Sequence, residues 1–84
     1  MVEHSAHLDA VFHALSDPTR RAMLGHLAER ECTIGELATP FSMSFAGASK
    51  HVRVLEHAGL LTRNDGLVVR TTDGDEFQIQ IVKR

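Results

Sequence analysis

One stretch in the second half of the chain, residues 44–61, constrains the fold most. Apolar side chains recur there at the three-then-four spacing of a buried helix face, namely Phe45, Ala48, Val52 and Leu55. Ser44 is suited to cap the N-terminus of this helix, and Gly59 is suited to end it. The sequence therefore predicts a helix over residues 44–58 that buries one face in a small domain.

The opposite face of this helix has the composition of a surface that approaches nucleic acid. Ala46 and Gly47 are small enough for close approach, and three basic side chains follow them, which are Lys50, His51 and Arg53. Cations attract phosphate, and a narrow helix face fits the major groove. An ordinary surface helix is the alternative interpretation, although it would carry more charge and fewer small residues. The residues alone leave both interpretations open.

Two helices are predicted near the N-terminus, over residues 5–15 and 18–30. Asp17 can cap the second helix, and Pro18 suits its first position because the N–H that proline lacks has no helical partner there. The apolar side chains expected on one side of the first helix are Leu8, Val11, Phe12 and Leu15. The second helix is expected to bury Ala22, Met23 and Leu27.

A third, short helix is predicted over residues 33–38, where Thr33 and Glu36 form the pattern of a capping box. Together with the helix at 44–58 it has the proportions of a helix-turn-helix, which would span about residues 33–58.

Beyond Gly59 the apolar residues alternate, which is typical of β-strands. The expected strands are residues 60–63, 67–72 and 77–82, with turns at 64–66 and 73–74. The expected fold class is therefore mainly α with a small β-ribbon: a winged helix-turn-helix of four helices and two strands. The wing would span about residues 60–82, and residues 77–82 could add a further C-terminal strand.

With 84 residues the chain is long enough for one domain, expected over residues 1–84. Its net charge of −2 argues mildly against nucleic acid, but the charge is uneven. Residues 1–43 carry three cations and six anions, whereas residues 44–70 carry four cations and two anions. The positive part thus coincides with the predicted helix at 44–58 and the first strands, as expected for a protein that binds DNA in one orientation.

Three motifs, in this order, resemble those of the arsenical-resistance-repressor (ArsR-type) family of bacterial transcription regulators. They are Leu15–Arg21 (LSDPTRR), Thr33–Ala38 (TIGELA) and Ser49–Leu61 (SKHVRVLEHAGLL). The resemblance covers about residues 8–63. It implies a winged helix-turn-helix that acts as a homodimeric repressor and binds double-stranded operator DNA in a sequence-specific way. Its helix 44–58 would enter the major groove.

The resemblance also implies which side chains contact DNA. On the recognition helix these are Ser44, Ala46, Gly47, Ser49, Lys50, His51 and Arg53. Lys50 and Arg53 could reach either phosphate or guanine edges, and their spacing does not decide between the two. His51 could donate to DNA or pack against the wing.

Three further arginines are candidates for DNA contact. Arg20 could contact phosphate or pair with Asp17, and Arg63 and Arg70 flank the wing, where they would meet phosphate, a minor groove or solvent.

Many ArsR-type relatives sense metals through two cysteines of the third helix, at positions that correspond to Thr33 and Gly35 here. Cys32 is the single cysteine and lies one residue away, so no thiolate metal site and no cofactor are expected. Cys32 would instead act as a small buried apolar residue. His4 and His7 are a candidate pair of nitrogen ligands for a metal ion. The alternative interpretation is that both lie on a frayed N-terminus.

The last 14 residues do not resemble the family, whose dimers use a helix after the wing. Dimerisation through the first helix is therefore expected. The alternative function is a protein-interaction module that binds a partner through its C-terminal strand edge. An enzyme is not expected, because no nucleophile–base–acid pattern is present. The single cysteine, the absence of a membrane-spanning run and the absence of a signal-peptide pattern predict a cytoplasmic protein without membrane contact.

Overall fold

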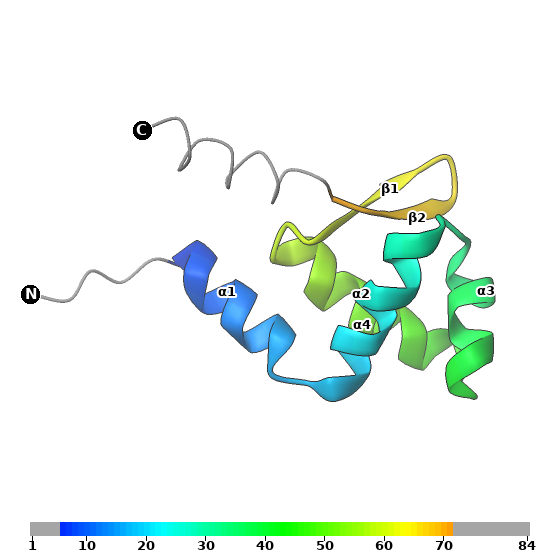
Figure 1. Ribbon diagram of the computed structural model, residues 1–84, viewed down its shortest axis with the longest axis horizontal. Helices are drawn as coiled ribbons and strands as arrows, with labels where there is room; N and C mark the ends of the chain where they lie inside the picture. Colours follow the sequence, from blue (N-terminus) through cyan, green and yellow to red (C-terminus); the bar gives the residue numbers. More distant parts are fainter. Residues whose placement is uncertain (1–5, 72–84) are drawn as a thin grey trace, which may run out of the picture.

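The computed structural model describes residues 6–71, which form helices followed by an antiparallel hairpin. The elements are α1 (Ala6–Leu15), α2 (Pro18–Glu29), α3 (Ile34–Ala38), the 3-10 turn η1 (Thr39–Phe41), α4 (Phe45–His57), β1 (Leu61–Asn64) and β2 (Leu67–Arg70). Figure 1 shows α2, α3 and α4 grouped below the hairpin, with α1 extending to one side. The predicted winged helix-turn-helix is confirmed. The expected strand at 77–82 lies outside the described residues.

The ends of the helices follow their local sequence signals. The Asp17 carboxylate accepts a hydrogen bond from the Arg20 backbone N–H at 2.9 Å, and Pro18 is the first residue of α2. At α3 both halves of the capping box are present: Thr33 Oγ1 accepts from the Glu36 N–H at 3.1 Å, and Glu36 Oε1 accepts from the Thr33 N–H at 2.9 Å. These bonds satisfy N–H groups that have no partner within their own helix.

Replacing Thr33 by alanine is expected to lower the free energy of unfolding by about 1 kcal/mol, because the N-terminal amides of α3 lose their side-chain acceptor. Thermal or urea unfolding followed by circular dichroism measures this loss. Thr62, which is exposed on β1, offers a matched control. Equal losses from Thr33→Ala and Thr62→Ala would show that the capping box contributes nothing specific.

The end of α4 directs the chain into the wing. Gly59 has a φ of +77°, a conformation that glycine adopts without strain. The Gly59 N–H donates to Glu56 O and the Leu60 N–H donates to Leu55 O, both at 2.9 Å. This is the pattern of a Schellman motif, so Gly59 ends the helix as predicted.

The wing is a tight hairpin that is tied to the start of the helix-turn-helix. Asp65 and Gly66 both have positive φ, +53° and +81°, as a two-residue hairpin turn requires. This confirms the turn expected at 64–66. Cys32 also pairs with Val68 of β2, with N···O distances of 2.6 and 3.3 Å. No local sequence pattern predicts this pairing.

The core lies between the helices and the hairpin, and its largest fully buried side chains are Met23, Leu37, Val52, Leu55, Leu61 and Val68. The predicted burial of two residues, Phe45 and Ala22, is wrong. Phe45 is 61% exposed because it lies in the first turn of α4, where a side chain points toward the N-terminus and past the packed region. Ala22 is exposed because α2 buries the face that carries Met23 and Leu27.

The apolar side of α1 divides into two parts. Val11 is half-buried against the core and Leu15 is half-buried, whereas Leu8 is 49% and Phe12 is 68% exposed. Helix α1 therefore presents two exposed apolar side chains, Leu8 and Phe12.

Candidate nucleic-acid interface

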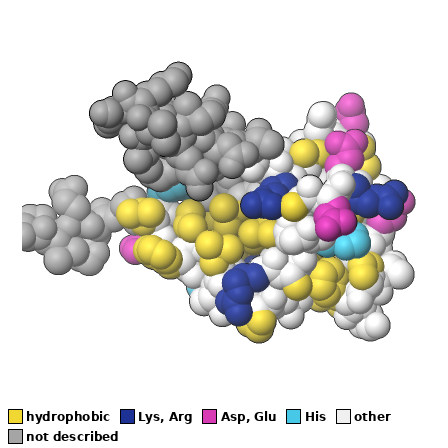
Figure 2. Space-filling model, in the orientation of Figure 1, with side chains coloured by type: hydrophobic (Ala, Val, Ile, Leu, Met, Phe, Trp, Pro, Cys, Tyr) yellow, Lys and Arg dark blue, Asp and Glu magenta, His cyan; other side chains and the backbone are white. Residues whose placement is uncertain are grey.

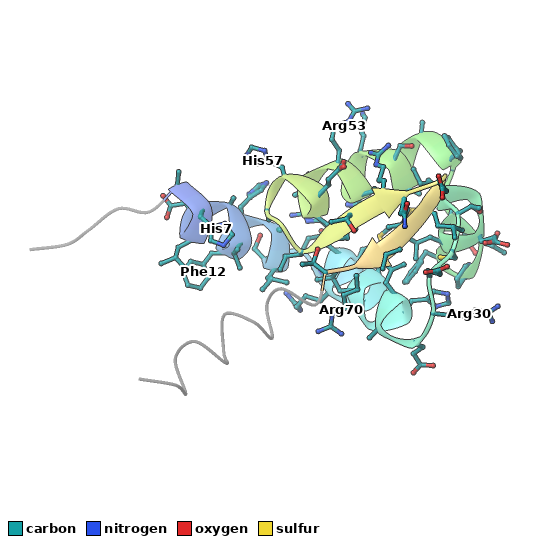
Figure 3. The ribbon with its side chains drawn as sticks, turned by 90° about the horizontal axis from the view of Figure 1, so that it is seen from above. His7, Phe12, Arg30, Arg53, His57 and Arg70 are labelled. Atoms are coloured by element: carbon teal, nitrogen blue, oxygen red, sulfur yellow. The ribbon has the colours of Figure 1, made fainter. Side chains whose placement is uncertain are left out.

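Four exposed residues form one stripe along α4: Ala46, Lys50, Arg53 and His57. Their spacing of four, three and four residues places them on the same side of the helix, opposite the buried Ala48, Val52 and Leu55. Figure 3 shows Arg53 and His57 projecting from α4 in the same direction. The predicted residues Ala46, Lys50 and Arg53 thus lie together. His57 was not among the predicted DNA contacts, although its spacing of four residues from Arg53 places both side chains on one face of the helix.

The two cations of this α4 stripe have no partner within residues 6–71. Neither Lys50 nor Arg53 makes a hydrogen bond or an ion pair with another described side chain or carbonyl, and both are exposed. Their charges are therefore available to a phosphate oxygen or a base edge.

The first turn of α4 is shaped by Ser44 and Gly47. Ser44 Oγ accepts from the Gly47 N–H at 3.0 Å, which caps the helix. A Cβ atom on Gly47 would lie 3.3 Å from this oxygen, so glycine leaves room for the cap as well as for a close surface. Ser49, a further predicted contact, is half-buried on the same helix.

Arg20 lies against α1 and α4. Its Nε donates to Ala14 O at 2.8 Å, its Nη2 donates to His13 O at 2.9 Å, and its Nη1 is 3.4 Å from Nδ1 of the half-buried His51. His51 thus lies beside Arg20.

Asp17 accepts from the backbone of Arg20 and makes no ion pair with its guanidinium. The pKa of the Asp17 carboxyl lies below its ordinary value, first because it accepts that N–H and also because of the charge of Arg20, while partial desolvation opposes the shift.

The two wing arginines occupy different places. Arg63 Nε lies 3.2 Å from Glu56 Oε1 of α4, and both side chains are 41% exposed. Arg70 pairs with Leu61 at the base of the hairpin. In Figure 3 it extends away from the side on which Arg53 projects, so it does not join the α4 stripe.

An open groove of about 790 Å³ runs between α1 and α4 beside the stripe. Its lining residues are Asp9, Ala10 and His13 from α1, and Lys50, Arg53, Val54 and His57 from α4. Two histidines and two cations thus surround a partly apolar floor. No sequence pattern connects His13 with His57, because only the packing of α1 on α4 brings them to one groove.

Cys32 is 5% exposed, and burial raises the pKa of its thiol, as does the nearby Glu36 carboxylate, while Arg30 opposes the shift. The structure thus gives Cys32 the surroundings of a packed, protonated thiol. Within residues 6–71 no group of three or more His, Cys, Asp and Glu side chains is arranged to hold a metal ion. His4, half of the predicted His4–His7 pair, lies outside the described residues. No described helix is long and apolar enough to cross a membrane.

Native protein at neutral pH is expected to react with iodoacetamide much more slowly at Cys32 than protein unfolded in urea, because the thiol is both covered and protonated. Mass spectrometry of the alkylated fraction over time measures the two rates. Similar rates in the two states would show that Cys32 is accessible and ionised in the folded protein.

A helix-turn-helix whose second helix exposes cations and small residues, followed by a β-hairpin, defines the winged helix-turn-helix class of DNA-binding proteins. Residues 15–64 match the family described as a helix-turn-helix domain. The chain belongs to this family and, within it, to the ArsR-type transcriptional regulators.

Relatives and solved structures support this assignment. The HTH-type transcriptional regulator Rv2034 of Mycobacterium tuberculosis is 36% identical over 81 residues, which cover 82% of this chain and 76% of the relative. The transcriptional repressor SdpR of Bacillus subtilis is 36% identical over 55 residues, 66% of this chain and 61% of SdpR. YuzN of Bacillus subtilis, an uncharacterized HTH-type transcriptional regulator, is 46% identical over 61 residues, 64% of this chain and 66% of YuzN. The chain thus spans just under two thirds of the two Bacillus relatives.

The crystal structure of an ArsR family transcriptional regulator is 30% identical and has a TM-score of 0.74, with 99% of this chain and 91% of that chain covered. The homodimeric winged helix-turn-helix DNA-binding domain Mb0332 of Mycobacterium bovis shares the fold, with a TM-score of 0.75, 24% identity and coverage of 99% and 90%.

Proposed function

We propose that this protein is a homodimeric repressor that binds operator DNA by inserting α4 into the major groove. The observation that carries the proposal is the α4 stripe, in which Lys50 and Arg53 are exposed and have no partner within residues 6–71. Ala46 and Gly47 allow the helix backbone to approach the base edges, and Ser44 and Ser49 supply hydroxyl donors near the phosphates.

Arg63 is proposed as a contact from the wing to the DNA backbone. Its ion pair with Glu56 is half-exposed and is therefore worth little, roughly 0–1 kcal/mol. Exchange of Glu56 for a phosphate is thus energetically feasible. Arg70 would reach phosphate only from the other side of the hairpin, so we expect it to contribute least. Arg20 would act from behind the helix rather than by direct contact.

A dimer formed through α1 fits the exposed apolar surface there. Leu8 is 49% and Phe12 is 68% exposed, and their spacing of four residues places them side by side on α1, as in a contiguous apolar interaction surface. Figure 2 shows hydrophobic side chains gathered at the α1 end of the face that it draws. The Mycobacterium bovis neighbour is a homodimer. Two copies would also double the positive surface, which offsets the small net negative charge of each chain.

Repression is the direction of regulation that we propose, in line with SdpR, which is named a transcriptional repressor. We propose no enzymatic activity, no thiolate metal sensing, no membrane contact and a cytoplasmic location. The alternative of a protein-interaction module depends on residues 77–82, which lie outside the described residues. It becomes the preferred function only if the folded protein binds no duplex DNA in the following experiment.

The test is a fluorescence-anisotropy titration of the protein against a duplex of its own promoter region, with an unrelated duplex of equal length as the control. Tighter binding to the promoter, weakened steeply as salt concentration rises, is expected, because bound cations release counterions from the DNA. A folded dimer that binds neither duplex at low salt would contradict the proposal.

A further inference from the structure

Arg20 connects three elements through one guanidinium. Its Nε and Nη2 donate to Ala14 O and His13 O, at 2.8 and 2.9 Å, and its Nη1 lies 3.4 Å from His51 Nδ1. The two carbonyls belong to the last turn of α1, where carbonyl groups have no helical donor. Because two bonds to α1 fix the plane of the guanidinium, they also fix the direction in which Nη1 faces α4.

The chemistry of the guanidinium determines which nitrogen of His51 carries the proton. An arginine side chain contains only donors and stays protonated, so in a hydrogen bond with Nη1 the Nδ1 of His51 is the acceptor. A neutral imidazole carries one N–H, and with Nδ1 accepting, that proton lies on Nε2. The two ring nitrogens point in divergent directions, and the Nε2–H is therefore directed away from Arg20.

We propose that Arg20 is a positioning residue for DNA recognition, which holds His51 as the neutral Nε2–H tautomer so that its ring offers DNA one donor and no acceptor. This inference rests on the proposed function. A single donor matches a phosphate oxygen, guanine N7 or O6, or adenine N7, and it does not match the amino group of cytosine. Arg20 thus acts through His51, while its own donors remain on α1 and α4.

The first test needs no DNA. In protein labelled with ¹⁵N, two-bond ¹H–¹⁵N correlation spectra of the histidine rings distinguish the two neutral tautomers, and the signal absent from a His51→Gln variant identifies His51. We expect the Nε2–H pattern in the wild type and an averaged pattern in Arg20→Met.

The matched control is Arg21→Met. Arg21 Nη1 donates to Leu15 O at 2.6 Å, at the same end of α1, but it makes no contact with His51. This variant should keep the Nε2–H pattern. An Nδ1–H pattern in the wild type would refute the positioning role, and this spectrum decides the matter even if Arg20→Met does not fold.

The second test is a double-mutant cycle on operator affinity. Arg20→Met and His51→Ala are each expected to weaken binding about tenfold, because either change costs the proposed hydrogen bond from His51 to DNA in each protomer; Arg20→Met also removes the two bonds to α1, which do not touch DNA. The double variant should also lose about tenfold, since both changes remove the same contact. Losses that multiply to about a hundredfold would mean that Arg20 acts independently of His51, through DNA or through the fold, and would overturn the proposal.

The two proposals fail in different ways. A wild-type protein with no affinity for duplex DNA would refute the proposed function, and with it the role of the tautomer in recognition. DNA binding combined with an Nδ1–H tautomer or with multiplying losses would refute the positioning role alone.

Discussion

Replacing Lys50 and Arg53 together by alanine is expected to weaken operator binding by at least about a hundredfold, since a base contact by one such side chain is worth about 1–3 kcal/mol. In a dimer the double variant removes these side chains from both protomers. Neither makes a hydrogen bond or an ion pair with another described residue, so the fold should be unchanged. Anisotropy titrations at several salt concentrations measure the loss, and circular dichroism verifies the fold.

The single variants separate two kinds of contact that the sequence could not distinguish. A side chain bound to phosphate lowers the slope of log affinity against log salt by about 0.9 for each contact removed, whereas a base contact changes the preference among operator sequences. Arg30→Ala is the matched control, because Arg30 is exposed and lies at the far end of the molecule from α1 in Figure 3. If Arg30→Ala weakened binding as much as Lys50→Ala or Arg53→Ala, affinity would depend on total charge and not on α4.

Replacing Leu37 by alanine is expected to lower the free energy of unfolding by about 2–5 kcal/mol, because Leu37 is 0% exposed and its removal leaves a cavity between α3 and α4. A domain of this size has a total stability of about 5–15 kcal/mol, so the loss is a large fraction of it. Urea unfolding at one fixed protein concentration measures it, since the proposed dimerisation would make stability depend on concentration.

Leu24→Ala removes the same atoms from a half-buried position of α2 and is expected to cost clearly less. A loss below about 1 kcal/mol for Leu37→Ala would mean that the interface between α3 and α4 can collapse around the missing side chain, and that the angle of the helix-turn-helix does not depend on it.

The sequence predicts the helix ends and turns well, because the signals for them are local. Asp17, Thr33 and Gly59 each act within a few residues of their own position, and the hydrogen bonds found there are those expected. Periodicity indicates which face of a helix is apolar but not where the core beneath that face begins. Phe45 continues the apolar spacing of α4 yet lies beyond the packed region, and for this reason the prediction of its burial is wrong.

The candidate site likewise has a part that local sequence predicts and a part that depends on tertiary packing. The α4 stripe could be predicted almost in full, because its residues lie on one helix and follow its period. The contact of Arg20 with His51 and the groove that joins His13 to His57 could not, since each depends on how helices distant in sequence pack together. Arg20 shows the consequence most clearly: the sequence left contact with phosphate and an ion pair with Asp17 as its alternatives, whereas its guanidinium lies on the carbonyl end of α1.

The pairing of Cys32 with Val68 has a consequence for how the protein adapts to its target. The backbone hydrogen bonds of this pairing connect the wing to the segment before α3, and the hairpin follows α4 directly in the chain. The wing and the recognition helix should therefore move as one rigid body. In the proposed dimer, tolerance for operators whose two half-sites are one base pair closer or farther apart would then come from hinge motion between protomers, and mutations at the α1 surface should alter that tolerance more than mutations in the hairpin.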